Sequence, residues 1–262
     1  MPPPLRMPWP TPPSPRPHPT PRRPTQPRPT QLPPRTDPFR VSRAPAVVPA
    51  FDAVIVAGGR AHRLHGASKP ALLWNGRSLR DRSLAAVGSA RAIVWVGDGD
   101  AGLDPRVIVT RERPLYGGPA AALAAGLAAL PHPLAPMIVV IAVDLPRIEE
   151  AVAALLSAVA VADADVDVDD GDGTARSRDG VIGVDAAGFR QPLLAAYRSE
   201  ALESAVRSHA DPIDGSSLRR LIRDLRLREI ALPDGVTADI DTPEDAAYHG
   251  IALPHETEEH TP

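Results

Sequence analysis

The sequence predicts an α/β fold, a three-layer sandwich with a mostly parallel central sheet, preceded by a disordered proline-rich tail. From residue 51 onward, short apolar runs of strand length alternate with segments of helical periodicity. Such alternation is typical of parallel sheets covered by helices. Before that point, residues 1–50 hold 19 of the 33 prolines and eight arginines but a single acidic residue. A segment of that composition buries too little apolar surface to offset its ordering entropy, so we expect it to be disordered or polyproline-like.

The first predicted elements lie between residues 51 and 110. Residues 53–57 (AVIVA) form an apolar run that ends at Gly58-Gly59, a pattern typical of a buried parallel strand. Residues 78–90 place leucine and valine at helical spacing and predict an amphipathic helix. Residues 92–96 (AIVWV) and 107–109 (VIV) are rich in β-branched residues and predict the next two strands.

The middle of the chain predicts two helices that flank the most apolar strand. Residues 119–130 are rich in alanine and leucine and begin with proline, which suits the first turn of a helix. Residues 137–143 (MIVVIAV) are the most apolar run and are followed at once by Asp144. Residues 148–162 repeat apolar side chains at helical spacing and predict the second helix.

An acidic stretch, residues 163–172 (DADVDVDDGD), follows this helix. A calcium-binding EF-hand loop needs glycine at its sixth position and glutamate at its twelfth, and no frame of the stretch supplies both. We therefore predict a strand at its start and an acidic surface loop in the rest, without bound calcium.

The remaining elements complete the sheet and its helical layers. Residues 181–184 and 193–197 are apolar and predict two further strands, while residues 230–232 predict the last one. Residues 199–208 and 216–224 alternate apolar and charged side chains at helical spacing and predict two amphipathic helices.

Composition divides the chain into three predicted parts: the tail at 1–50, one folded domain at 51–250 and a flexible acidic C-terminal tail at 251–262. The N-terminal tail carries a net charge of +7 (eight arginines less one acid). Since the whole chain carries −3, the remainder carries a net charge of −10. An acidic folded part argues against a duplex nucleic-acid binder. The tail itself is interpreted as a dispensable extension or, alternatively, as a recruiter of SH3-like or WW-like partners.

Several classes of protein are excluded by what the sequence lacks. It has no cysteine, which excludes disulfides, zinc–thiolate sites and cysteine nucleophiles. No run of ~18 apolar residues predicts a transmembrane helix, so no membrane partner is expected. The N-terminus also lacks the apolar core of a signal peptide, and we therefore expect the protein in the cytoplasm. The oligomeric state is left open.

Polar residues follow three of the predicted strands: the loop at Gly58, the pair Gly117-Gly118 and Asp144. Ligands of parallel α/β sheets bind at the carboxyl ends of the strands, so these residues mark the expected site. A glycine-rich loop suits phosphate because backbone N–H groups can approach the anion closely. However, the loop lacks the Gly-Lys-Ser/Thr of a Walker A motif and the G-x-G-x-x-G of a dinucleotide fingerprint. It leads instead to Lys69, the only lysine of the chain, beside 28 arginines.

Five ordered motifs over residues 52–248 resemble the molybdenum cofactor guanylyltransferase family, whose domain is MobA-like. Residues 57–70 (AGGRAHRLHGASKP) resemble the first motif of that family. The others are residues 117–127 (GGPAAALAAGL), 143–146 (VDLP), 190–198 (RQPLLAAYR) and 239–245 (DIDTPED). The resemblance implies a Rossmann-like, nucleotide-diphospho-sugar transferase-like domain. Its activity would be the magnesium-dependent transfer of GMP from GTP to molybdopterin, with release of pyrophosphate.

The resemblance also implies roles for individual residues. Lys69, Arg63 and Asp144 would be catalytic, with the cations placed against the phosphates, where positive charge and fixed donors stabilise the developing charge. Asp144 and Asp241 would hold magnesium, which prefers carboxylate oxygens. The residues implied to bind the nucleotide are Val56, Ala57, Gly58, Gly59, Arg63, Gly66, Lys69, Gly117 and Gly118.

Other readings of the same residues stay open at this point. Asp144 and Asp241 could each cap a helix, and Gly117-Gly118 could serve only to start one. His65 stands where the family often has glycine, and Arg113 where it has an acid, with Glu112 adjacent. The alternatives to guanylyl transfer are cytidylyl transfer in the same pathway, sugar-phosphate nucleotidyl transfer, and an inactive nucleotide-binding protein.

Overall fold

The computed structural model describes residues 47–58, 68–99, 103–164, 178–209, 217–251 and 253. All of them belong to one compact unit, Ala44–Pro262. The predicted N-terminal tail up to residue 46, nearly all of the acidic stretch and residues 254–262 lie outside the described residues.

The described residues form a main sheet of seven strands in the order β5-β4-β1-β6-β8-β7-β9. These strands are β1 (Phe51–Val56), β4 (Ile93–Val96), β5 (Ile108–Thr110), β6 (Met137–Ala142), β7 (Gly180–Val184), β8 (Arg190–Arg198) and β9 (Leu227–Ala231). All neighbours pair in parallel except at β8, which runs antiparallel to both β6 and β7. The predicted mostly parallel sheet is therefore confirmed, with β8 as its one reversed strand among the described residues.

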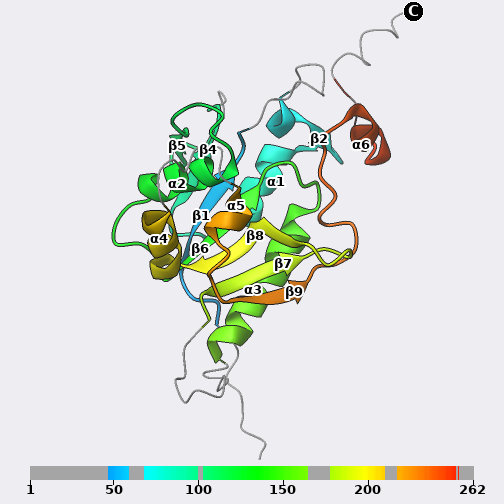
Figure 1. Cartoon of the computed structure of the whole chain (residues 1–262). Helices are drawn as coiled ribbons and strands as arrows, with labels where there is room; N and C mark the ends of the chain where they lie inside the picture. Colours follow the sequence, from blue (N-terminus) through cyan, green and yellow to red (C-terminus); the bar gives the residue numbers. More distant parts are fainter. Residues whose placement is uncertain are drawn as a thin grey trace, which may run out of the picture. The chain divides into compact units, whose positions relative to one another are not determined.

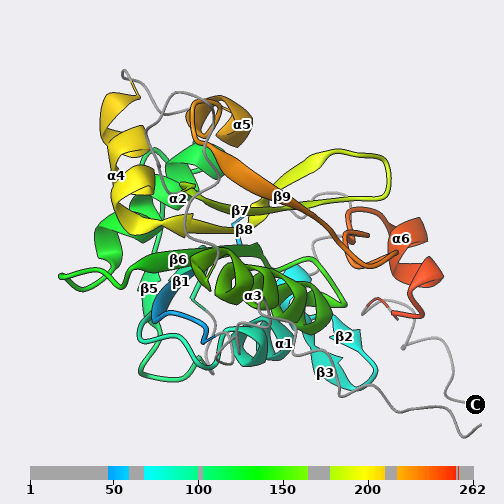
Figure 2. The same cartoon turned by 90° about the horizontal axis from the view of Figure 1, so that it is seen from below.

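Helices cover both faces of this sheet (Figure 1). The α-helices of the described residues are α1 (Leu79–Ala86), α2 (Pro119–Ala129), α3 (Ile148–Ala164), α4 (Ser199–Ser208), α5 (Leu218–Leu221) and, away from both faces, α6 (Pro243–Tyr248). Figure 2 shows α2, α4 and α5 on one face and α1 and α3 on the other, which confirms the three layers. Within the described residues, no helix combines the length and the apolar character needed to cross a bilayer.

β6 is apolar throughout, and β1 is apolar except for Asp52, whose buried carboxylate pairs with Arg91, because both faces of these strands are covered. Ala53 and Ile55 of β1 enter the core shared with α3, whereas Val54 and Val56 enter the core shared with α2 and α4. Successive side chains of a strand point to opposite faces. A continuous apolar run is therefore what two-sided burial requires, and all six residues of β1 are buried.

A second, two-stranded sheet lies beside the main one. It is a hairpin of β2 (Leu73–Trp74) and β3 (Arg77–Ser78), preceded by the 3₁₀ helix η2 (Lys69–Ala71). Asn75 and Gly76 form its turn with φ of 50° and 76°, as the favoured two-residue hairpin turn requires. A small third core packs this hairpin and α1 against the segment around α6. Its buried members are Leu72, Leu79, Ile240, Ala246, Ile251 and Leu253.

Three sequence-based expectations for elements are wrong in detail. The helix expected at 216–224 is only the single turn of α5, because Arg226 N–H donates to Asp179 Oδ2 and the chain must turn there to enter β9. The strand expected from residue 163 is also wrong at its start, since Asp163 and Ala164 continue α3. In addition, β9 begins at Leu227, three residues before the predicted strand, because it pairs along the whole of β7.

Candidate active site

The carboxyl ends of four neighbouring strands are joined by backbone hydrogen bonds. The donors and acceptors are Val143 N to Val56 O (3.1 Å), Ala57 N to Val96 O (2.8 Å) and Gly97 N to Thr110 O (3.0 Å). They fix the first residues of the loops after β1, β4 and β6 relative to one another. The loops that follow these ends therefore start from a rigid edge, where the sequence-predicted residues Val56, Ala57, Gly58 and Asp144 lie.

Lys69 reaches this edge from η2. Its Nζ donates to Asp144 Oδ2 at 3.2 Å and also to Asp241 Oδ1, and its side chain is 19% exposed. Burial by itself lowers the pKa of Lys69, but the charges and hydrogen bonds of Asp144 and Asp241 outweigh it, so the pKa is raised. The lysine is therefore a fixed, fully charged ammonium at neutral pH.

A third carboxylate, Asp239, joins Asp144 and Asp241. One oxygen of each lies within 4.8 Å of the others. Burial and then the charges of Asp144 and Asp241 raise the pKa of Asp239, which is the expected response of a carboxyl group beside two like charges. Three hard oxygen donors suit Mg²⁺, whose opposite ligands are separated by about 4.2 Å. The donor set thus fits a magnesium ion.

Sequence reasoning missed Asp239. The signal was present in the sequence, because Asp239 and Asp241 flank the apolar Ile240, and residues two apart share a face when a segment is extended. The resemblance to the family implied a metal role for Asp241 alone.

The segment that carries these two aspartates is tied to the rest of the site. Ile240 N–H donates to Asp144 O at 3.2 Å, and the Ile240 side chain is buried in the third core. The helix α6 that follows is capped by Thr242, in a capping box with Asp245. The open question of whether Asp241 caps this helix is thereby answered: its carboxylate accepts from Lys69, and the cap is Thr242.

On the other side of β1, the loop after β5 lies against Gly58. A Cβ atom at Gly58 would be 3.7 Å from Glu112 Oε1. The Glu112 side chain is buried, and its Oε1 accepts from Tyr116 N at 3.1 Å. Gly118 is the N-cap of α2, with φ of 88°. Gly117 and Gly118 therefore do start a helix, and the same loop places a carboxylate beside Gly58.

The predicted residues divide into those that the structure describes and those that it does not. It brings Lys69, Asp144 and Asp241 into direct contact, and it places Gly58 beside the loop of Gly117 and Gly118. The predicted residues Gly59, Arg63 and Gly66, together with His65, lie outside the described residues.

Comparison with protein families gives one match to this chain. Residues 53–230 match the family model described as "MobA-like NTP transferase domain". The match covers β1 through β9 except for Phe51, Asp52 and Ala231, and it ends before Asp239 and Asp241. No curated protein matches the chain.

Several solved structures share the fold. Rv0371c from Mycobacterium tuberculosis is 20% identical, with a TM-score of 0.57, and the match covers 77% of this chain and 98% of that one. A nucleotidyl transferase from Methanothermobacter is 18% identical with a TM-score of 0.53, covering 76% and 95%. The 2-C-methyl-D-erythritol 4-phosphate cytidylyltransferase from Thermus thermophilus is 17% identical, also with a TM-score of 0.53, covering 76% and 97%. At such identities these likenesses show the fold alone.

Proposed function

The chain belongs to the MobA-like NTP transferase family, and from that premise we propose that it transfers GMP from GTP to molybdopterin with magnesium. An acceptor phosphate oxygen attacks the α-phosphorus of the triphosphate. The bond from the α-phosphorus to the bridging oxygen breaks, and pyrophosphate leaves with the electron pair. The domain responsible would span residues 51–250, and the reaction would take place in the cytoplasm as a step of molybdenum cofactor biosynthesis.

One observation carries the proposal of phosphate chemistry: the contact of Lys69 with Asp144 and Asp241 at the carboxyl edge of the sheet. A compact ammonium beside carboxylates is what a site needs to hold a metal-bound polyphosphate, because the charges on the phosphates must be balanced on several sides. When bound, magnesium would neutralise part of the phosphate charge and activate the α-phosphorus. Asp144, Asp239 and Asp241 are the residues that would hold it.

Lys69 has a second task in this proposal. Its ammonium would leave the carboxylates for the phosphates once the nucleotide arrives, because both partners attract the same cation. A point charge on a flexible stem suits such a move better than the planar guanidinium of arginine. This requirement accounts for a lysine at this one position in a chain that otherwise uses arginine.

The choice of guanine rests on Glu112. Asp144 follows β6, which is the neighbour of β1 on one side, whereas Glu112 lies against Gly58 on the other side of β1. If the phosphates of the nucleotide bind near Asp144, its base would therefore lie near Glu112. A carboxylate accepts hydrogen bonds but does not donate them. The pairing edge of guanine presents two adjacent donors, an imino and an amino N–H, whereas cytosine presents one amino group and uracil one imide N–H. Glu112 thus favours guanine over the cytidylyl and uridylyl alternatives.

The test is an assay of pyrophosphate release with GTP, CTP, UTP and ATP, each with magnesium and with or without molybdopterin. The proposal expects release with GTP only when molybdopterin is present. Release with CTP would favour the cytidylyltransferase reading, and release with a sugar phosphate as acceptor would favour the sugar-nucleotide reading. Thermal stabilisation by GTP without any release would indicate the inactive nucleotide-binding protein and would contradict the proposal.

A further inference from the structure

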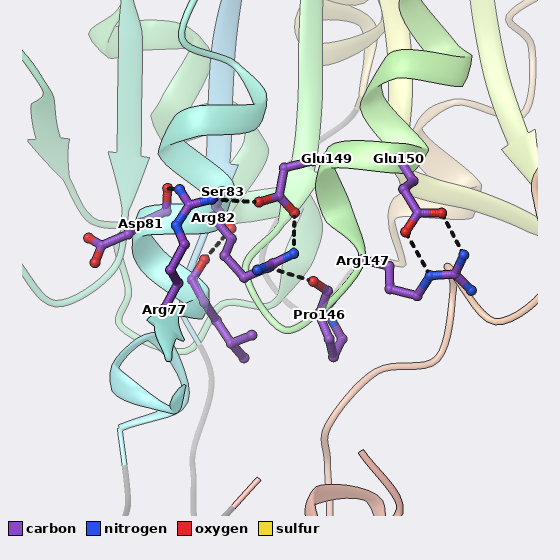
Figure 3. Close-up of polar contacts among 9 residues, drawn as sticks. Arg77, Asp81, Arg82, Ser83, Pro146, Arg147, Glu149 and Glu150 are labelled. Carbon is purple, nitrogen blue, oxygen red and sulfur yellow. Dashed lines mark hydrogen bonds and ion pairs between the residues drawn. The ribbon is translucent and has the colours of Figure 1, made fainter. Parts of the chain in front are cut away.

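Arg82 of α1 contacts two of the three chain segments that supply the charged residues of the site, the segment beside Lys69 and the one after Asp144. Its Nε donates to Pro146 O at 2.8 Å, and its Nη2 lies 3.0 Å from Glu149 Oε2. Its guanidinium carbon lies 4.4 Å from the centre of the Trp74 ring. Figure 3 shows Arg82 extended between Pro146 and Glu149. The side chain is only 14% exposed, so these contacts fill most of its surroundings.

The first segment reaches Lys69 through a short series of bonds. Leu72 N–H donates to Lys69 O at 3.1 Å, and Leu79 N–H, at the start of α1, donates to Leu72 O at 3.0 Å. Trp74 lies two residues after Leu72, in the first strand of the hairpin. Arg82 is three residues after Leu79 and so lies on the same face of α1. A change in the position of Arg82 relative to Trp74 would therefore alter the position of the Lys69 segment.

The second segment carries Asp144. Pro146 lies two residues after Asp144, and Glu149 lies in the first turn of α3. Arg82 thus holds this loop at two points: at the carbonyl of Pro146, before α3, and at the carboxylate of Glu149, within α3. Because Asp144 lies just ahead of them, a shift of the loop would change the separation between Lys69 and Asp144.

We propose that Arg82 is a positioning residue, which fixes the Lys69 segment against the Asp144 loop so that the ammonium can reach the phosphates while Asp144 holds the metal at the separation that the reaction needs. This role rests on the function proposed above. Arginine suits it because a planar guanidinium stacks on an aromatic ring with its face while it donates in its own plane. A lysine would keep the charge but could not make both contacts at once.

The test compares Arg82→Lys and Arg82→Met with Arg77→Met as the matched control. Arg77 lies 3.3 Å from Glu149 Oε1 and its side chain is half exposed. Its guanidinium also donates to Asp81 O, and its backbone pairs with Trp74 in the hairpin, so Arg77→Met removes a contact to Glu149 without removing the one to Pro146. For both Arg82 variants we expect kcat to fall about tenfold or more and KM for the triphosphate to change less than about threefold, because misplacement of the reacting groups lowers the rate rather than ground-state binding. We also expect the dissociation constant for Mn²⁺, measured by calorimetry, to rise about fivefold. Arg77→Met should leave all three quantities within about twofold of the wild type.

A merely structural role would lower the melting temperature and leave kcat and the Mn²⁺ dissociation constant unchanged, and that result would overturn the proposal. In Arg82→Met, the Glu149 carboxylate loses one of its charged partners. The double variant Arg82→Met/Glu149→Gln removes that carboxylate charge as well. If the double variant recovered full kcat, the loss in Arg82→Met would come from the unpaired charge of Glu149, and the proposal would be overturned. If Arg82→Met does not fold, Arg82→Lys, which keeps the stem and the charge, decides the question alone. A wild type that releases no pyrophosphate contradicts the proposed function, whereas an active wild type with a fully active Arg82→Lys contradicts only the role of Arg82.

Discussion

Lys69 Nζ lies 3.2 Å from Asp144 Oδ2, although 75 residues separate the two in the sequence. The same ammonium contacts Asp241. The Lys69 ammonium therefore occupies a position between two carboxylates, and a metal ion would bind at the same position. At the proposed magnesium site, lysine and metal would therefore compete for the same oxygens, and a bound nucleotide would favour the metal by offering the lysine another anion. The first prediction follows from this competition.

Replacement of Lys69 by methionine is expected to tighten Mn²⁺ binding in the absence of nucleotide by about tenfold, because the competing positive charge is gone. Turnover should fall by about 100- to 1,000-fold, because the phosphates lose one fixed cation. Calorimetry and pyrophosphate release measure the two effects. Lys69→Arg is the control, which keeps the charge and should not tighten metal binding. Weaker Mn²⁺ binding by Lys69→Met would show that the lysine does not compete with the metal.

The three carboxylates are expected to differ in their contribution to metal binding. Asp144→Asn and Asp241→Asn should each raise the half-activating magnesium concentration by about 10- to 100-fold, since each removes a charged oxygen ligand. Asp239→Asn should have a smaller effect, because Asp239 is exposed and the other two are half-buried. Asp234→Asn, at an exposed loop position, controls for the change of net charge. Equal effects at all four positions would indicate a general charge effect and no specific site.

Glu112→Gln is expected to lower kcat/KM for GTP by about 10- to 100-fold, because an amide accepts more weakly than a carboxylate and presents a donor to the donors of guanine. The amide oxygen can still accept from Tyr116 N, so the loop should keep its shape. The melting temperature provides that control. Unchanged preference among GTP, CTP and UTP in a folded Glu112→Gln variant would remove Glu112 from base recognition.

Asp245 gives a prediction for pH. Its Oδ2 accepts from Asp241 N at 3.1 Å and from Thr242 N and Oγ1 at 2.8 Å. The hydrogen bond from the Thr242 side chain is the main cause that lowers the pKa of Asp245 below its ordinary value of 3.8. A carboxyl whose pKa is lowered by folding contributes stability above its unfolded pKa and loses it as the pH falls through the folded value.

Asp245→Ala should therefore lower the melting temperature at about pH 7, and the difference from the wild type should shrink as the pH falls below 3.8. Metal binding should also weaken, since the backbone of Asp241 loses its acceptor. Glu244→Ala, at the neighbouring exposed position, is the control for removing an acid from the first turn of α6. A difference that stays constant down to about pH 2 would mean that the charge of Asp245 has no part in it.

Gly126 of α2 tests how closely this helix approaches the sheet. A Cβ atom there would lie 2.5 Å from Val54 Cγ1 and 2.9 Å from Val96 Cγ2. Alanine favours a helix over glycine by about 1 kcal/mol, but overpacking of a filled core costs about 1–3 kcal/mol. We expect Gly126→Ala to lower the free energy of unfolding, as measured by urea denaturation. The exposed Ala128→Gly in the same helix measures the propensity effect alone, and a more stable Gly126→Ala would show that the core accommodates the methyl group.

Most elements could be predicted from the sequence because two-sided burial leaves a strong pattern. The strands around Val54 and Val140 read as unbroken apolar runs, and Pro119 marks the start of α2. Short elements were predicted less well. The hairpin at Asn75-Gly76 was not predicted, although that dipeptide is a strong turn signal, because each of its strands has only two residues.

The site could be predicted only as far as local motifs reach. Lys69, Asp144 and Asp241 follow from the motifs, but their contact depends on how segments 75 and 172 residues apart fold together. The same holds for Arg82, which has no motif of its own and whose surroundings are set by tertiary packing. Asp239 could have been found from its spacing to Asp241, whereas the place of Glu112 beside Gly58 depends on the path of the loop after β5.

Two of the three carboxylates, Asp239 and Asp241, follow β9, the last strand of the sheet among the described residues. During synthesis on the ribosome, all seven strands of the main sheet therefore emerge before Asp239 and Asp241, two of the three residues proposed to hold magnesium. The strands can therefore begin to pair before the proposed metal site is complete. A frameshift or stop codon just beyond Ala231 would thus yield a chain that keeps every strand of the sheet, and with it the loops beside Gly58, yet has a single aspartate left to hold the metal.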